Sequence, residues 1–112
     1  MSSLDPSADC NGFETVIQMI GGKWKLWILR TLIFSGTQRF GELRRSVHGI
    51  TQTMLTQQLR ALENDGLVSR RVYAEVPPKV EYTATQKALD LREFFQAMFD
   101  WAARNPPNNT ES

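Results

Sequence analysis

The chain has 112 residues, which is enough for one domain with a core of its own but small for an independent enzyme. Apolar residues make up 41% of the sequence and charged residues 22%, an ordinary globular composition. No apolar run is long enough to cross a bilayer, and the polar, acidic start lacks the basic region of a signal peptide, so we expect a cytoplasmic protein without a membrane partner.

The net charge of +1 is distributed unevenly along the chain. Residues 20–80 carry ten Lys/Arg and four Asp/Glu (10 − 4 = +6), whereas the two flanks carry three bases and eight acids (3 − 8 = −5). A basic centre between acidic ends favours a polyanion-binding face on a module with a second task. The alternative is a chance clustering of solvated lysines and arginines.

The N-terminal third predicts an arm followed by two helices. Residues 1–12 contain Ser, Pro, Asp, Asn and Gly without apolar periodicity, which predicts a flexible arm. FETVIQMI, from Phe13 on, places its apolar residues on one face of a short helix, which the following glycine pair ends. Residues 23–34 are apolar nearly all round, so they predict the central helix of the core.

The next segment predicts a helix-turn-helix. Residues 40–46 form a short helical pattern, and His48-Gly49 marks a turn. The longer stretch TQTMLTQQLRALEND, residues 51–65, carries leucines at i, i+4 and i+7, the period of an amphipathic helix. Thr51 is a good N-cap, and Gly66 supplies the stop because glycine takes the left-handed conformation without steric cost.

The polar face of the 51–65 helix predicts a DNA-reading surface. It carries Thr53, Thr56, Gln57 and Arg60, with Gln52 at its N-terminal edge. Such a face is almost uncharged at its start, which is unusual for a solvent-exposed surface. Glutamine and threonine offer donors and acceptors that suit base edges in a major groove. The alternative is an ordinary amphipathic helix with a Gln/Thr surface.

Two strand-like segments follow. Residues 67–74 and 79–84 are rich in Val, Tyr and Thr, and VEYTA alternates between faces as a half-buried strand does. The prolines between them rigidify the tip and cannot donate to a ladder. A helix-turn-helix followed by a hairpin is a winged helix, and Arg70, Arg71 and Lys79 place positive charge on its wing.

The last predicted helix spans residues 85–103 and carries more apolar surface than one small domain needs. Thr85 is its predicted cap, and two adjoining stripes of apolar residues cover more than half of its circumference. The surplus predicts a partner helix, most simply the same helix of a second copy. The alternative is that the first helix and the wing cover all of it. Residues 105–112 predict a disordered tail.

Three stretches resemble the HxlR family of bacterial transcription regulators: GGKWKLWIL at 21–29, RFGELRRSVHGITQTMLTQQLRALENDGLVSR at 39–70, and VYAEVPPKVEYTAT at 72–85. The resemblance covers about residues 10–103, and departs from the family pattern after residue 85, where TATQKA replaces a TPLG-like start. It implies a mainly α fold with a β-hairpin wing (α+β), a homodimer built from terminal helices, a recognition helix that begins at Thr51, and wings that reach flanking DNA.

The only cysteine, Cys10, excludes an internal disulfide and a zinc site with several thiolates. It lies at or just before the predicted first helix, where the helix dipole favours a thiolate, although Asp9 and Glu14 oppose that effect. A lone cysteine is most often a small filler or an incidental thiol. In the family that the chain resembles, some members use a cysteine at this place to sense quinones, aldehydes or oxidants. Oxidation here can give only an interchain disulfide, a mixed disulfide or an adduct.

We therefore predict a flexible arm (1–12), a winged helix-turn-helix domain (13–104) with a dimerisation helix (85–103), and a disordered tail (105–112). The protein is predicted to be a dimeric, sequence-specific transcription regulator that binds double-stranded operator DNA with two half-sites, with Cys10 as a candidate sensor of oxidants or electrophiles. No enzyme, cofactor or metal site is expected, because one His and one Cys far apart give no catalytic constellation. The alternative is a winged helix that binds only protein.

The predicted site residues form two groups. Gln52, Thr53, Thr56 and Gln57 are predicted to read bases, and Thr51, at the start of the recognition helix, is also predicted to bind DNA. The cations are predicted to contact phosphates or the minor groove: Arg39, Arg60, Arg70, Arg71 and Lys79. The dimer interface is predicted to contain Phe13, Leu91, Phe94, Phe95, Met98 and Trp101.

Overall fold

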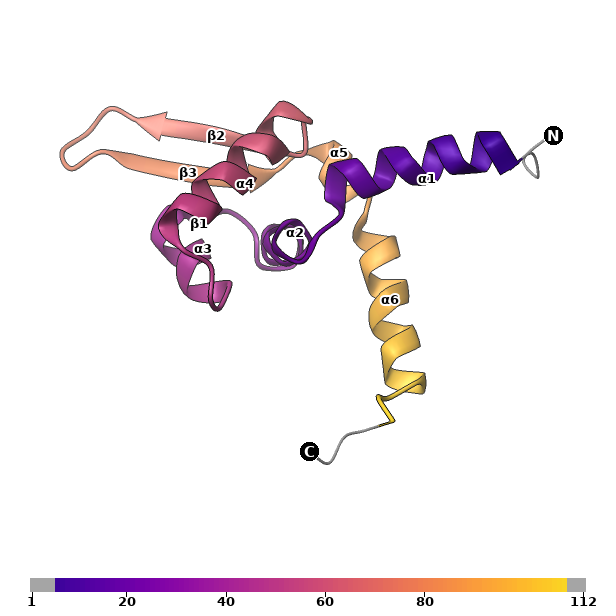
Figure 1. Ribbon diagram of the computed structural model, residues 1–112. Helices are drawn as coiled ribbons and strands as arrows, with labels where there is room; N and C mark the ends of the chain where they lie inside the picture. Colours follow the sequence, from indigo (N-terminus) through magenta and orange to yellow (C-terminus); the bar gives the residue numbers. More distant parts are fainter. Residues whose placement is uncertain (1–5, 109–112) are drawn as a thin grey trace.

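The computed structural model describes residues 6–108, with side chains from residue 12 onward. Its elements are α1 (Pro6–Ile20), α2 (Lys23–Ser35), β1 (Gln38–Arg39), α3 (Phe40–Ser46), α4 (Gln52–Asn64), β2 (Val68–Tyr73), β3 (Lys79–Ala84), α5 (Gln86–Leu89) and α6 (Arg92–Arg104) (Figure 1). This mainly helical fold with a small antiparallel sheet confirms the predicted fold class. Within the described part, none of the helices is both long and apolar enough to cross a membrane.

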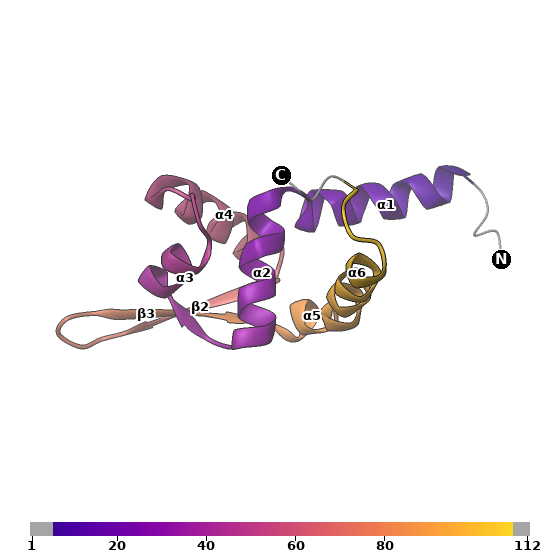
Figure 2. The same ribbon diagram turned by 90° about the horizontal axis from the view of Figure 1, so that it is seen from below.

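Helix α2 is the centre of the core, as its nearly continuous apolar sequence predicts. Ile28, Leu29, Leu32 and Ile33 are buried, and the helix contacts α3, α4, β3, α5 and α6. Figure 2 shows α2 between the α3–α4 pair on one side and α5–α6 on the other. The buried hydroxyl of Thr31 donates to the carbonyl of Trp27 at 3.1 Å, so this polar group does not lack a partner.

The N-terminal prediction was wrong, because α1 begins at Pro6 rather than at Phe13. Proline is favourable at the first helical position: its ring fixes φ, and the missing N–H would be unpaired there anyway. Residues 1–5 lie outside the described part. The backbone of Cys10 therefore belongs to the second turn of α1 instead of preceding the helix. The dipole argument for a thiolate is correspondingly weaker, since that effect falls off within the first turn.

The helix-turn-helix follows the predicted pattern. The Oγ1 atom of Thr51 accepts from the N–H of Met54 at 3.1 Å, which confirms the predicted cap of α4. Leu55, Leu59 and Leu62 are buried on one side of this helix. Gly66 follows the helix with a φ of 76°, the left-handed conformation that ends a helix most cheaply in glycine.

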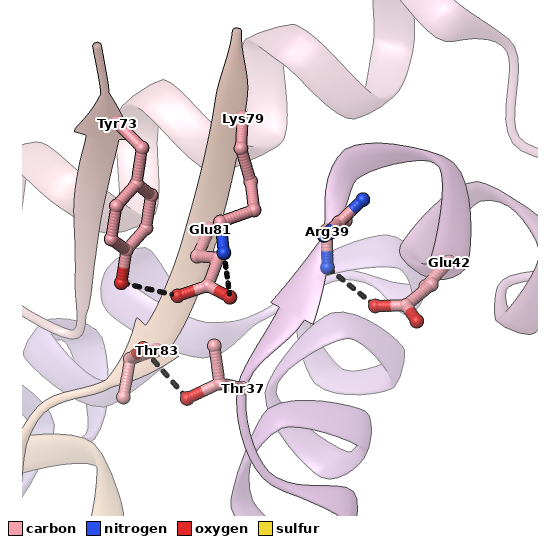
Figure 3. Close-up of polar contacts among 7 residues, drawn as sticks. All are labelled: Thr37, Arg39, Glu42, Tyr73, Lys79, Glu81 and Thr83. Carbon is pink, nitrogen blue, oxygen red and sulfur yellow. Dashed lines mark hydrogen bonds and ion pairs between the residues drawn. The ribbon is translucent and has the colours of Figure 1, made fainter. Parts of the chain in front are cut away.

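The wing is a β2–β3 hairpin to which a third strand is added. Residues of β2 and β3 pair antiparallel from Val68↔Ala84 to Tyr73↔Lys79. The sequence did not predict β1, whose two residues are too few to show a strand pattern. It pairs with β3 in the order β1-β3-β2, and so joins the start of α3 to the wing. The hydroxyls of Thr37 and Thr83, 2.9 Å apart, extend this connection (Figure 3).

The predicted helix 85–103 is broken in two, which corrects the sequence interpretation. Helix α5 ends in a tight turn, where the N–H of Leu91 donates to the carbonyl of Ala88 at 2.9 Å, and α6 then begins at Arg92. Nη2 of Arg92 donates to the carbonyl of Ile33 near the end of α2 at 2.9 Å. Ala88 of α5 and Phe95 of α6 are both buried in the core. Residues 105–108 form no helix or strand, and residues 109–112 of the predicted tail lie outside the described residues.

Thr85 joins α5 to the turn after α4, and this junction is open to a stability test. Its Oγ1 donates to the carbonyl of Gly66 at 2.6 Å and accepts from the N–H of Ala88 at 3.4 Å. Thr85→Val keeps the shape and removes both bonds, so it should lower the free energy of unfolding in urea by about 1–2 kcal/mol. Thr85→Ser retains the hydroxyl and should stay close to the wild type. Equal losses in both variants would contradict this role.

Candidate nucleic-acid interface

The polar face of α4 is open to solvent. Gln52, Thr53, Gln57 and Arg60 are exposed, and Thr56 is half-buried. The three leucines on the other side fix the rotation of the helix, because burying them turns the polar positions outward. The structure thus brings together on one face the residues of α4 that the sequence predicted to read bases.

The hydroxyls on α4 differ in what they offer a ligand. Thr56 Oγ1 donates to the carbonyl of Gln52 at 3.0 Å, so its hydrogen is engaged within the helix and its oxygen can only accept. Thr51 Oγ1 accepts from Met54, which leaves its hydrogen free to donate. The side chains of Gln52 and Gln57 make no hydrogen bond among the described residues. The two amides are consequently the most available donor-acceptor groups of this face.

The predicted cations of the wing lie on opposite faces of the sheet. Residues alternate along a strand, and the register pairs Arg71 with Glu81 and Tyr73 with Lys79. Arg39 of β1 also pairs with Glu81, so it shares their face. Arg70, one residue away from Arg71, points to the opposite face, where its Nε lies 3.8 Å from Oε1 of Glu63 on α4.

Tyr73 and Glu81, which the sequence did not predict as site residues, lie on the same face of the wing as Arg71 and Lys79 (Figure 3). We call this the outer face, because the opposite face, with Arg70, is the one turned toward α4. The hydroxyl of Tyr73 donates to Oε1 of Glu81 at 2.8 Å, and this hydrogen bond raises the pKa of Tyr73. Lys79 Nζ lies 3.9 Å from Oε2 of Glu81 and 4.2 Å from the centre of the Tyr73 ring. Arg71 lies 4.8 Å from the same ring. The strand alternation of VEYTA together with the hairpin register could have located this cluster.

The backbone of Arg39 stabilises the start of α3, whereas its side chain is exposed. Its backbone N–H donates to Oε1 of Glu42 at 2.7 Å, which closes the first turn of α3 (Figure 3). Its side chain is exposed on the outer face of the sheet. Arg39 thus lies on the same face as Arg71 and Lys79, where it adds a third cation.

Most of the predicted dimer residues are exposed within the single chain. Phe13 is 68% exposed and Trp101 60%, and Phe94 and Met98 are exposed as well. Leu91 is half-buried. Phe95 is a correction: it is only 2% exposed because it packs in the core of its own chain, with its ring centre 6.4 Å from that of Phe34.

The exposed apolar side chains line a groove between α1 and α6. The groove has a volume of about 360 Å³, and its lining includes Phe13, Val16, Ile17, Phe94 and Met98. Phe94 and Met98 of α6 stay exposed in the single chain. The alternative in which α1 and the wing cover all of the apolar surface of the last helix therefore does not hold. An apolar surface of this kind marks an interaction site.

Comparisons with known proteins agree with this geometry. Residues 19–110 match the family model described as HxlR-like helix-turn-helix. The putative regulatory protein MalR of Fusobacterium mortiferum is 46% identical over 92 residues, which span 82% of this chain and 87% of MalR. YkvN of Bacillus subtilis, an uncharacterized HTH-type transcriptional regulator, is 48% identical over 90 residues, 80% of this chain and 75% of YkvN.

Solved structures with similar folds include the redox regulator HypR and the transcriptional regulator YodB. The redox regulator HypR in its oxidized form superposes with a TM-score of 0.78 at 44% identity, covering 86% of this chain and 98% of HypR. The reduced form of the transcriptional regulator YodB from B. subtilis gives a TM-score of 0.73 at 35% identity, covering 83% of this chain and 90% of YodB. The diamide-treated form of YodB gives a TM-score of 0.68 at 35% identity, covering 82% of this chain and 90% of YodB.

Proposed function

The chain belongs to the HxlR-like helix-turn-helix family of DNA-binding transcription regulators, and we propose that it binds a two-half-site operator as a homodimer and responds to oxidants through Cys10. The observation that carries the proposal is the exposed, neutral polar face of α4 beside a cationic wing. A neutral face with free amides selects sequence, while the surrounding cations supply affinity.

Helix α4 is proposed to enter the major groove. The side-chain amides of Gln52 and Gln57, which have no hydrogen-bond partner among residues 6–108, can each form a bidentate pair with the N6 and N7 atoms of adenine. The free hydroxyl hydrogen of Thr51 lies at the N-terminus of α4, a position suited to a backbone phosphate. On the wing, Arg71 and Lys79 are proposed to contact flanking phosphates or the minor groove.

The homodimer is proposed on the apolar groove between α1 and α6. A second copy that placed its own α1 and α6 there would cover Phe13, Phe94, Met98 and Trp101 symmetrically. A symmetric dimer would present two α4 helices to half-sites about 34 Å apart on one side of the duplex.

The rival function is a winged helix that binds only protein. Such a module would not need the excess of cations in residues 20–80, so the charge distribution favours DNA. Titration of the protein with duplex DNA at several salt concentrations separates the two. DNA binding that weakens steeply with salt supports the regulator, and no binding at low salt supports the rival.

Redox sensing by Cys10 is proposed because the redox regulator HypR and the regulator YodB, which also has a diamide-treated form, share this fold. In addition, Cys10 lies in α1, whose later turns line the apolar groove. Modification of a residue in α1 would bias the arrangement of two subunits rather than the reading face itself. To empty a mostly populated DNA-binding state, the modification must favour the other state by about 5 kcal/mol. A covalent bridge between chains can supply a difference of that size.

The reading face can be tested by comparing Gln57→Ala with Lys79→Ala. Loss of a bidentate amide–base pair should weaken specific binding by about 1–3 kcal/mol and leave binding to random DNA nearly unchanged. Lys79→Ala should instead weaken both equally and lower the slope of log affinity against log salt by about one. Fluorescence anisotropy with operator and scrambled duplexes measures both effects. If Gln57→Ala loses the same affinity on both duplexes, Gln57 does not read a base.

The dimer proposal predicts that Trp101→Ala shifts the sedimentation coefficient toward that of a monomer, since it removes a large apolar side chain that is exposed in the single chain. Gln96→Ala on the same helix changes an exposed polar residue and serves as the matched control. Wild-type protein that sediments as a monomer at micromolar concentration, yet binds a single half-site, would overturn the proposal.

The redox proposal predicts an oxidant-dependent change in operator affinity that requires Cys10. DNA titrations before and after treatment with diamide or a quinone should differ for the wild type and agree for Cys10→Ser, because the thiol is the only one in the chain. Added thiol should reverse a disulfide. If wild type and Cys10→Ser respond alike, Cys10 is not the sensor.

A further inference from the structure

A small cavity of about 190 Å³ lies between the recognition helix and the wing. Helix α4 contributes one wall, and neighbouring residues of β2 and β3, paired in register, contribute the other. Its lining consists of Thr56, Leu59, Arg60, Glu63, Arg70 and Tyr82. The cavity therefore collects two guanidinium groups, one phenol and one carboxylate from three separate elements.

The position of Arg70 depends on Glu63. Oε1 of Glu63 lies 3.8 Å from Nε of Arg70, and the two side chains are 38% and 46% exposed. An ion pair this exposed contributes little to folding stability, so its main effect is on side-chain geometry. Because the carboxylate faces the Nε edge, the two terminal nitrogens of the guanidinium remain available as donors for a second anion.

Tyr82 offers a further donor. It is half-buried, and its hydroxyl forms no hydrogen bond within the part of the chain that the structure describes. Burial raises the pKa of Tyr82, Arg70 lowers it and Glu63 raises it, with the net shift upward. The phenol consequently stays protonated at neutral pH, and its O–H remains available to a ligand that can accept a hydrogen bond.

Resting on the proposed DNA binding, we propose that this cavity binds one phosphate of the DNA backbone, with Arg60, Arg70 and Tyr82 as donors and Glu63 as the residue that positions Arg70. Two guanidinium groups against one carboxylate leave a charge of +1, which matches one phosphodiester. Forked guanidinium donors fit phosphate oxygens in a bidentate manner. A phosphate held by α4, β2 and β3 together would fix the register of the recognition helix on the duplex.

The first test uses Tyr82→Phe, which removes one oxygen atom and leaves the ring. Loss of a hydrogen bond to a charged phosphate should weaken operator and random DNA alike by about tenfold. Urea unfolding of the variant should match the wild type, because the hydroxyl has no partner among the described residues. Tyr73→Phe is the matched change on the opposite face of the same hairpin, where the hydroxyl already donates to Glu81, and should weaken DNA binding less.

The second test asks whether Glu63→Gln weakens or tightens DNA binding. If only net charge mattered, removing a carboxylate beside DNA would tighten binding and increase the salt dependence. If Glu63 positions Arg70, the same substitution should weaken binding severalfold on operator and random DNA. Glu75→Gln on the wing removes the same charge without breaking an ion pair among the described residues, and should tighten binding slightly.

The outcomes separate the two proposals. Suppose that the wild type binds DNA. If Tyr82→Phe then binds DNA with the wild-type affinity, or if Glu63→Gln binds as tightly as Glu75→Gln, the phosphate site is overturned and the proposed regulator function stands. Wild type that binds no DNA at any salt concentration overturns both. Parallel losses of Tyr82→Phe and Glu63→Gln on both duplexes, with unfolding free energies unchanged, support the phosphate site.

Discussion

The structure depends on the burial of α2. A helix that is apolar on almost every side must be covered from several directions at once, and here α3 and α4 cover one side while α5 and α6 cover another. Each covering helix then has only one face to bury. For α4 that face is the leucine stripe, so the opposite polar face remains accessible. The exposure of this face, which is proposed to read DNA, therefore follows from how the core is closed.

Several cations of the basic centre already have a partner within the chain. Lys25 Nζ donates to the carbonyl of Gln18 at 3.1 Å, and Arg70 and Lys79 each face a carboxylate. Outside the centre, Lys87 donates to the carbonyl of Asp65 at 2.7 Å, and Arg92 to that of Ile33. Long cationic side chains thus satisfy the carbonyls that helix ends leave unpaired. A count of charges along the sequence does not show which cations already face a carboxylate, as Arg70 and Lys79 do.

The sequence predicted those parts of the fold whose determinants are local and periodic. The leucines of α4, its Thr51 cap and Gly66 lie within one stretch, and so do the alternating residues of the wing. The breaks and additions depend on distant partners and were missed. The apolar pattern runs unbroken through Leu91, although the helix does not, and β1 exists only because β3 offers it an edge. The early start of α1 has little signal in the sequence, because residues 6–12 lack apolar periodicity and only Pro6 indicates a first helical position.

The two-residue strand β1 has a consequence for how an operator is recognised. Through β1, α3 is tied to the wing, and through the Glu63–Arg70 pair the wing is tied to α4. These contacts connect α3, α4 and the wing, the elements that are proposed to face DNA. In the proposed dimer, a subunit connected in this way would follow a displaced half-site as a whole. Each base pair inserted between half-sites rotates one of them by roughly 34° about the duplex axis. Tolerance to operator spacing would then be set mainly at the contact between subunits.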